Sequence, residues 1–264
     1  MSMYQADRLI LICNDDGIFS KGIRALAELA SEFGDVAIVA PDRQQSAVGH
    51  SITILNPLRA TKFRLDDRFS GLAVNGTPAD CVKLAHDKLL PRKPDLVLSG
   101  INHGSNAGIN IMYSGTVSAA TEATILGYPA IAVSCADFDE DADLSGSIEA
   151  ARRAVSYVLT HGLPAGVTLN VNAPGGAYRG LKLTQMAHGR YVDEFVEREH
   201  PNRTPYYWIT GRLEVFDQGE DFDIQALTSG YATITPIQYD LTAYPMLKFM
   251  ADRMGDIQNG IPLE

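Results

Sequence analysis

The sequence predicts an α/β protein with a mostly parallel sheet and helices on both faces. Short apolar runs alternate with amphipathic segments over about the first 135 residues, which is the pattern of repeated strand–helix–strand units. The run 8–13 (RLILIC) is almost continuously apolar, as in parallel strands that are covered on both faces. A chain of 264 residues with 45% hydrophobic and 20% charged residues can bury a sizeable core.

Each predicted element follows from a local pattern. Ile23, Leu26 and Phe33 lie at helical spacing before Gly34, which predicts an amphipathic helix that ends there. Pro78 suits the first turn of a helix because its missing N–H group is not needed there. The predicted strands cover residues 8–13, 36–41, 71–76, 95–100, 130–134 and 167–174. The predicted helices cover residues 20–34, 78–90, 116–127 and 147–159.

The pattern changes after about residue 175. Segments 181–187, 206–216 and 231–238 predict strands at hairpin-like spacing, and 241–254 predicts a terminal helix. We therefore expect a catalytic core of residues 1–175 and a smaller β-rich and helical extension of residues 176–264, which need not be an independent domain. The acidic segment 136–146 is expected to be a solvated loop.

Composition excludes several classes of protein. The formal net charge of −10 gives no general attraction for nucleic acids or anionic membranes. The three cysteines, Cys13, Cys81 and Cys135, form no CxxC pair, so we expect reduced, buried side chains rather than a secreted disulfide scaffold. The N-terminal apolar run is too short for a signal peptide or a membrane span. These features predict a cytoplasmic protein.

Polar residues follow four of the predicted strands. Asn14, Asp15, Asp16 and Gly17 follow the first strand, and Arg43 and Ser46 come after the second. Asn75–Thr77 follows the third, and the Asn- and Gly-rich segment 99–116 follows the fourth. Because the carboxyl ends of parallel strands share one edge of a sheet, these segments are expected to converge on one crevice.

Asp15 and Asp16 are adjacent carboxylates directly after a buried strand. Two like charges repel, so they either lie in water or hold a cation. Successive strand residues point to opposite faces, and both side chains can face one cation only if the backbone turns, which Gly17 makes easy. Oxygen ligands from Asp, Asn and Ser suit Mg²⁺ or Mn²⁺ rather than zinc. These residues alone leave a solvated turn and a cation site equally open.

Ser114, Gly115 and Thr116 immediately precede a predicted helix. The free N–H groups and the positive dipole end of a helix suit a phosphate, although a plain helix cap needs no ligand. Arg43 could offset phosphate charge or simply lie on the surface. The chain lacks HExxH, GxSxG, GxGxxG and a Walker A lysine, so histidine-metal, nucleophile-elbow, dinucleotide and P-loop sites have no support.

Five longer blocks occur in an order that is more specific than any single motif. They are NDDG, APDRQQSAVGHSIT, VNGTPADCV, SGINHGSNAGINIMYSGTVSAATEA and NVNAP. Together they resemble the SurE family of stationary-phase survival proteins, which are 5'/3'-nucleotidases, over roughly residues 8–174. The resemblance implies a Rossmann-like core, and homodimers or homotetramers built partly by exchanged C-terminal segments.

The resemblance also implies a phosphatase that uses one divalent cation per subunit, Mg²⁺ or Mn²⁺. Its substrates would be nucleoside 5'- and 3'-monophosphates, with short-chain polyphosphate as a further one. The implied metal ligands are Asp15, Asp16, Ser46 and Asn102. The implied phosphate-side residues are Asn106, Ser114, Gly115 and Thr116, to which Arg43 is added as a candidate. The implied catalytic residues are Asp15, Asp16, Asn102 and Ser114, and whether either aspartate acts as base or nucleophile stays open.

Two positions depart from the family pattern. Asn110 stands where the family commonly has an acid, and Ala47 and Val48 follow Ser46, where Gly or another small residue is usual. Neither change removes an implied ligand. Two other functions remain open: a nucleoside hydrolase that cleaves the N-glycosidic bond, and a nucleotide- or metal-sensing module without turnover. The reaction products would distinguish these alternatives.

Overall fold

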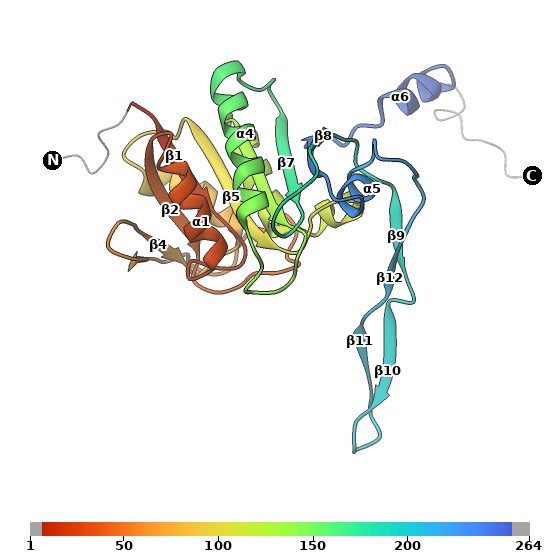
Figure 1. Ribbon diagram of the computed structural model, residues 1–264. Coiled ribbons are helices and arrows are strands. Elements are labelled where there is room, and N and C mark those ends of the chain that lie inside the picture. Colours follow the sequence, from red (N-terminus) through yellow and green to blue (C-terminus); the bar gives the residue numbers. More distant parts are fainter. Residues whose placement is uncertain (1–6, 255–264) are drawn as a thin grey trace, which may run out of the picture.

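The computed structural model describes residues 7–254, which contain one nine-stranded sheet (Figure 1). The strand order is β3-β4-β2-β1-β5-β6-β7-β13-β8, and the six strands from β4 to β7 are parallel. Those six are β1 (Leu9–Cys13), β2 (Asp35–Pro41), β4 (Ser70–Val74), β5 (Leu96–His103), β6 (Ala130–Cys135) and β7 (Val167–Ala173). The predicted α/β fold with a mostly parallel sheet is confirmed.

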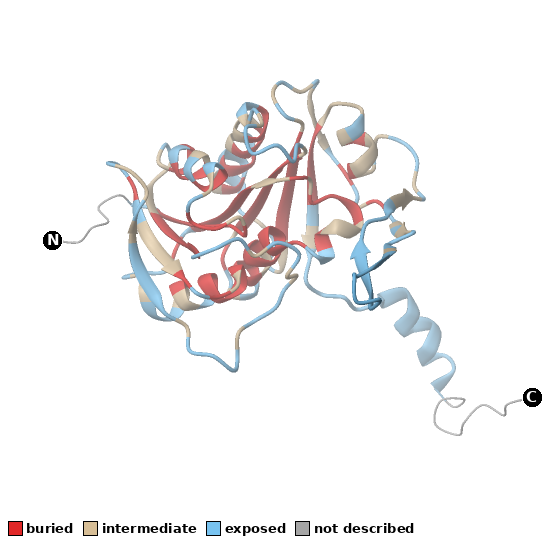
Figure 2. Ribbon diagram, turned by 90° about the horizontal axis from the view of Figure 1, so that it is seen from below, coloured by how far each residue is buried: buried red, intermediate tan, exposed pale blue. Residues whose placement is uncertain are grey.

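Helices cover both faces of this sheet. Helices α1 (Lys21–Ala30) and α4 (Ser145–His161) pack on one face, and α2 (Pro78–Leu84) and α3 (Gly115–Ile125) pack on the other. All of β1 is buried: Ile10 and Ile12 face the first pair of helices, whereas Leu11 and Cys13 face the second. Figure 2 shows the buried residues concentrated in the sheet and on the inner sides of these helices. Burial on both faces explains the unbroken apolar run in β1.

Local capping determines where the helices begin. Ser20 caps α1 by accepting a hydrogen bond from the Ile23 N–H group. Thr77 and Asp80 form a reciprocal capping box at the start of α2, which satisfies two N–H groups that the helix itself leaves free. The helix predicted over 78–90 is α-helical only to Leu84 and continues as a π-helical turn, η1 (Ala85–Leu89). The three cysteines are buried and free, as predicted.

The order of the strands places a crevice beside β1. The chain runs from β1 outward through β2 to β4, and then returns to β5 on the opposite side of β1. Ligands bind at such switch points, outside the carboxyl ends of the strands. Residues Asn14–Gly17 follow β1, and Asn102 lies near the end of β5, so the fold brings these two motifs to the same place.

The C-terminal segment contributes to the main sheet and also extends away from it. Strand β13 (Ala232–Gln238) pairs antiparallel with β7, and β8 (Leu181–Leu183) pairs with β13. Helix α5 (Asp223–Thr228) packs against β13. The main sheet therefore continues across residue 175. The division into a catalytic core of residues 1–175 and an extension of residues 176–264 remains a proposal about function.

A long two-part hairpin projects from the body of the molecule (Figure 1). Its base pairs β9 (Gly189–Val192) with β12 (Arg212–Val215), and its tip pairs β10 (Phe195–Glu199) with β11 (Pro205–Ile209). Helix α6 (Tyr244–Ala251) has no buried residue. The predicted strand 231–238 and the terminal helix are thus present as β13 and α6, and β8 is shorter than the predicted 181–187 strand. The predicted strand 206–216 is instead divided into β11 and β12 at Thr210 and Gly211, where Gly211 has a φ of +87°.

Several elements gave no signal in the sequence. They are β3 (Ala60–Arg64), β9, β10, α5 and the short 3₁₀ helix η2 (Gly108–Met112). Strand β3 is an antiparallel edge strand and is mostly exposed, so it lacks the apolar run on which the prediction depended. The acidic segment 136–146 is largely exposed, as predicted. Among residues 7–254, no helix combines the length and the apolar character that crossing a bilayer requires.

Candidate active site

A cavity of about 1010 Å³ opens at the carboxyl ends of β1 and β5. Six of the candidate metal-binding, phosphate-binding and catalytic residues line it: Asp15, Asp16, Ser46, Asn102, Asn106 and Ser114. They come from the segments after β1 and β2 and from the end of β5 and the segment that follows it, which do converge on one crevice. The fourth expected segment, Asn75–Thr77 after β4, is not among the lining residues, and Thr77 caps α2 instead. Arg43, Gly115 and Thr116 are not among the cavity-lining residues.

A tight turn presents the two aspartates. Gly17 has a φ of +91°, and a Cβ atom there would lie 3.1 Å from the carbonyl carbon of Arg43, so both conformation and space favour glycine. The Asn14 amide fixes the turn by donating hydrogen bonds to the Gly17 carbonyl (2.9 Å) and to the Ser20 hydroxyl (2.8 Å). The turn lets both carboxyl groups line one cavity.

Asp15 is buried and hydrogen-bonded to the Thr116 hydroxyl, which donates to its Oδ1 atom. Burial raises the pKa of Asp15 from 3.8 to about 6, the Thr116 hydrogen bond opposes this rise, and the neighbouring Asp16 charge adds to it. Burial also raises the pKa of Asp16. Two carboxyl groups that resist ionisation beside one another are the electrostatic environment that a bound cation relieves.

Asn102 and Ser46 add neutral oxygens to this cavity. The Asn102 amide nitrogen donates to the carbonyl oxygens of Gly104 (2.7 Å) and His103 (3.1 Å), so the orientation of the side chain is fixed and Oδ1 remains as its acceptor. Ser46 is exposed and lines the same cavity. The preceding residue is held because the Gln45 N–H group donates to the Asp15 carbonyl oxygen at 2.7 Å.

The Ser114–Thr116 turn lies against the aspartates. The Ser114 side chain caps α3 by accepting a hydrogen bond from the Val117 N–H group at 3.0 Å, and it also lines the cavity. A Cβ atom on Gly115 would lie 2.8 Å from the Asp15 Cβ atom, so glycine permits this close approach. Thr116 points to Asp15 rather than into the cavity. The helix N-terminus and the carboxyl pair therefore form one continuous surface.

Asn106 is held on both sides of its backbone. Its N–H group donates to Asn172 Oδ1 at 2.8 Å, and its carbonyl oxygen accepts from Asn170 Nδ2 at 2.7 Å. Its side-chain amide donates to Ser134 Oγ at 2.8 Å. All four residues are buried. Asn170 and Asn172 of the NVNAP block, which lie in β7, therefore fix the position of Asn106 in the cavity.

Arg43 is exposed and does not line the cavity. The turn at Gly17 packs against the Arg43 backbone instead. Its role as a phosphate ligand remains a prediction that this position does not support.

The charge of the cavity is strongly negative. Four carboxyl residues line it, Asp15, Asp16, Glu140 and Glu194, against one ammonium group, that of Lys21, which is itself bonded to Asp141. A phosphate monoester would be repelled from this surface unless a cation came between them. Hydrated Mg²⁺ is usually held by one or two carboxylates plus waters, and the Asp15–Asp16 pair with Asn102 and Ser46 fits that chemistry.

Groups of three or more His, Cys, Asp or Glu side chains arranged to hold a metal are absent from residues 7–254.

The sequence prediction missed the apolar wall of the cavity. Phe19, Tyr113, Phe138, Tyr191 and Ile209 all line it. Phe138 comes from the acidic loop, and Tyr191 and Ile209 come from the projecting hairpin. Their separation in the sequence left no local pattern by which they could have been found, although the isolated Phe138 within an acidic run was visible.

Comparison with known proteins gives a consistent result. The family model described as Survival protein SurE matches residues 10–193. The chain belongs to the SurE family. A 5'-nucleotidase SurE from Cytophaga hutchinsonii is 50% identical over 246 residues, covering 90% of this chain and 94% of the relative. A 5'-nucleotidase SurE from Moorella thermoacetica is 46% identical and covers 89% of this chain and 92% of the relative.

A solved structure supports the same assignment. The SurE protein from Aquifex aeolicus is 40% identical, with a TM-score of 0.78 over 91% of this chain and 97% of that one. The resemblance seen in the sequence blocks is therefore confirmed, and this SurE protein shares its fold with a solved family member along nearly its whole length.

Proposed function

We propose that this protein is a 5'-nucleotidase that hydrolyses nucleoside monophosphates to nucleoside and phosphate with the help of one divalent cation. The observation that carries the proposal is the pair of carboxyl groups, Asp15 and Asp16, that share one cavity with Asn102, Ser46 and the N-terminus of α3. The SurE relatives that carry the name 5'-nucleotidase support the reaction class.

The cation would be held by Asp15, Asp16, Ser46 and Asn102. Bound there, Mg²⁺ or Mn²⁺ supplies charge that stabilises phosphoryl oxygens and lowers the pKa of a bound water. Two acidic ligands leave room for water and substrate oxygens around a hard cation. This ligand set is supported by the convergence of these four side chains at one cavity.

The other residues would hold the substrate. Ser114, which lines the cavity at the N-terminus of α3, would bind the phosphate where the positive end of the helix dipole favours negative charge. Asn106, fixed through its backbone, would contact phosphoryl oxygens from the opposite side. Phosphoryl transfer depends mainly on positioning and charge stabilisation, so rigidly placed donors contribute directly to rate. Either Asp15 or Asp16 would accept a proton from the attacking water.

The cavity is suited to a nucleotide rather than to free phosphate alone. Phe19, Phe138 and Tyr191 line it beside the polar residues, and flat aromatic rings stack well on nucleobases. We extend the proposal to nucleoside 3'-monophosphates and short-chain polyphosphate, for which the support is the family resemblance of the sequence blocks.

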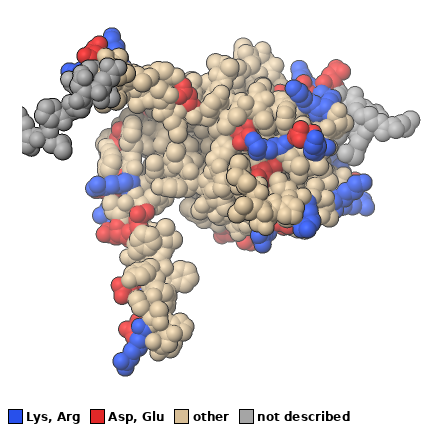
Figure 3. Space-filling view, turned by 180° about the vertical axis from the view of Figure 1, so that it is seen from behind, with Lys and Arg blue, Asp and Glu red and all other residues tan. Residues whose placement is uncertain are grey.

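We also propose a cytoplasmic homodimer or homotetramer. The tip of the hairpin exposes Tyr206, Tyr207, Trp208 and Ile209, and Figure 3 shows that much of its surface is uncharged. Exposed apolar surface of this kind is typical of a protein interface, so the C-terminal extension would supply the subunit contacts. Light scattering during gel filtration, with wild type and Trp208→Ser compared, tests this.

The proposed reaction is tested by measuring phosphate release. AMP, GMP and p-nitrophenyl phosphate are each incubated with Mg²⁺, Mn²⁺ or EDTA. We expect release of free phosphate with either cation and its loss in EDTA. Free base and ribose would indicate a nucleoside hydrolase, whereas ligand-dependent stabilisation without phosphate under any divalent ion would indicate a sensing module.

A further inference from the structure

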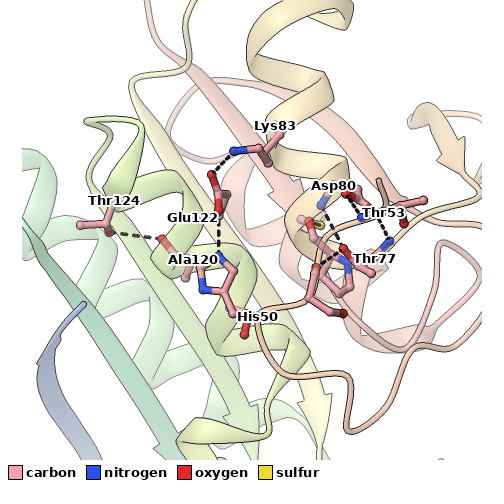
Figure 4. Close-up of polar contacts among 12 residues, drawn as sticks. His50, Thr53, Thr77, Asp80, Lys83, Ala120, Glu122 and Thr124 are labelled. Atoms are coloured by element: carbon pink, nitrogen blue, oxygen red, sulfur yellow. Dashed lines mark hydrogen bonds and ion pairs between the residues drawn. The ribbon is translucent and has the colours of Figure 1, made fainter. Parts of the chain in front are cut away.

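Glu122 is a buried carboxyl group that the proposed reaction does not use. It lies within α3, and its side chain is 5% exposed. His50 Nε2 lies 2.8 Å from one carboxyl oxygen, and Lys83 Nζ lies 2.9 Å from the other (Figure 4). We call His50, Lys83 and Glu122 the Glu122 network. Burial alone would raise the pKa of Glu122, but the hydrogen bonds from His50 and Lys83 outweigh it and lower that pKa.

The Glu122 network joins the two sides of the cavity. Glu122 belongs to α3, whose N-cap residue Ser114 lines the cavity. His50 comes four residues after Ser46, in the irregular segment 42–58 that follows β2. The His50–Glu122 contact therefore ties the segment that carries a proposed metal ligand to the helix that carries the proposed phosphate seat.

Ser46 lies between two sets of attachments. On one side the Gln45 N–H group donates to the Asp15 carbonyl oxygen at 2.7 Å; on the other the Gly49 N–H group donates to the Tyr113 carbonyl oxygen at 3.0 Å. The His50–Glu122 contact follows directly after the second attachment. On the other side of Ser46, the Gln44 side chain donates to Asp16 Oδ1 at 3.4 Å, so each backbone attachment has a side-chain contact beside it.

The backbone between these attachments is not in a relaxed conformation. Ala47 has a φ of +57°, which costs a residue with a side chain about 1 kcal/mol or more. Segment 42–58 is also mostly exposed, so little packing holds it. Its conformation is therefore held by specific contacts on both sides of Ala47, those of Gln44 and Gln45 before it and those of Gly49 and His50 after it.

We propose that His50 and Glu122, with Lys83 balancing the charge, are positioning residues that hold Ser46 towards the Asp15–Asp16 pair. The inference rests on the proposed metal site. Loss of the His50 contact would leave the Gly49–Tyr113 backbone bond without support from the next residue. Ala47 would then leave its left-handed conformation more readily and carry Ser46 away from the aspartates. The metal would then be bound more weakly although no ligand has been removed.

The test compares His50→Ala with His50→Gln and with the control His161→Ala. His50→Gln keeps an N–H donor for Glu122, and His161 is an exposed histidine at the end of α4. Hydrogen exchange measured over residues 44–58 should become about tenfold faster in His50→Ala because local opening is easier. Calorimetry should show Mn²⁺ binding about tenfold weaker, as is typical when support around a ligand is lost. His50→Gln should recover much of both losses, and His161→Ala should match wild type.

The dependence of activity on Mn²⁺ concentration distinguishes a positioning role of His50 from general damage to the fold. At limiting Mn²⁺, phosphate release from AMP should fall in His50→Ala, and at saturating Mn²⁺ it should return to within about threefold of wild type. Equal Mn²⁺ affinity and equal exchange in wild type and His50→Ala would overturn the inference and leave the proposed function intact. A wild-type protein that binds no Mn²⁺ would instead overturn the proposed function, and with it this inference.

Discussion

Two segments enclose the cavity, and they are held in very different ways. Segment 102–114 is buried or half-buried except at Met112 and Tyr113, and its backbone is hydrogen-bonded at Gly104, Asn106 and Gly108 to residues of β6, β7 and α5. Segment 42–58 is mostly exposed and depends on a few contacts such as His50–Glu122 and Thr53–Asp80. Segment 102–114 is therefore part of the core, whereas segment 42–58 lies on the surface of the core and is held there by these few contacts.

This difference predicts which kind of defect each segment produces. A substitution around segment 102–114 removes hydrogen bonds that nothing else can satisfy, so it should lower the free energy of unfolding. A substitution in segment 42–58 leaves the exposed groups in contact with water and should change function with little loss of stability. The following substitutions test this contrast, from the largest expected effect to the smallest.

Asn172→Ala should produce the largest loss of stability. It leaves the buried N–H group of Asn106 without its acceptor, which should lower the free energy of unfolding by about 2 to 3 kcal/mol. Urea denaturation measures this loss. The matched control is Asn56→Ala in the exposed segment 42–58, for which a change below about 0.5 kcal/mol is expected. An equal loss of unfolding free energy in Asn172→Ala and Asn56→Ala would contradict the proposed difference between the two segments.

Asp15→Asn tests the charge that the two segments enclose. The folded pKa of about 6 lies above the ordinary value of 3.8, so the folded protein binds more protons than the unfolded chain between these values. Asp15 therefore lowers stability progressively as pH rises from about 4 to about 6, and its full cost is present at pH 8.

In EDTA, Asp15→Asn should accordingly raise the free energy of unfolding at pH 8 by about 1 to 3 kcal/mol. At pH 4 it should change that free energy much less, because Asp15 is then mostly protonated in the folded protein. Denaturation at both pH values measures the difference. Equal destabilisation at pH 4 and pH 8 would contradict the assigned pKa.

The sequence predicted the position of the residues around β1 and segment 102–114 more fully than the contacts that hold segment 42–58. The buried run of β1 and the order of strands and helices predict where Asp15, Asp16 and Asn102 meet, because burial on both faces leaves a strong apolar pattern. The His50–Glu122 contact and the approach of Tyr191 depend on residues 72 and 81 positions apart in the chain. Such contacts arise only from tertiary packing, and no local pattern marks them.

Arg43 illustrates the same limit. Its place after β2 is consistent with a role at the strand edge, but the turn of the backbone decides whether a side chain faces the cavity, and Arg43 lies outside it. For Ser114 the sequence left a phosphate site and a plain helix cap open. Its side chain both caps α3 and lines the cavity.

Asn110→Asp should produce a moderate effect on the metal. Asn110 lines the cavity, and its Oδ1 atom accepts a hydrogen bond from the Tyr191 hydroxyl at 2.7 Å, which an aspartate can also accept. The added charge should tighten Mn²⁺ binding by about threefold through the cavity field. Calorimetry with Asn56→Asp as the matched charge control measures this. Weaker binding in Asn110→Asp would show that the Tyr191 contact had been lost.

Arg43→Ala should have the smallest effect. Its exposed side chain lies outside the cavity, so kcat/KM for AMP should change by less than about twofold at 0.15 M salt, where exposed charges are screened. A loss of tenfold or more would return Arg43 to the phosphate site.

The central claim is that Asp15 and Asp16 hold one divalent cation. Calorimetric titration of metal-free wild type and Asp16→Asn with MnCl₂ at pH 7.5 tests it most directly. We predict one Mn²⁺ per chain for wild type and binding at least about tenfold weaker for Asp16→Asn, because one of two acidic ligands becomes neutral. Equal affinity in the two proteins would contradict the claim.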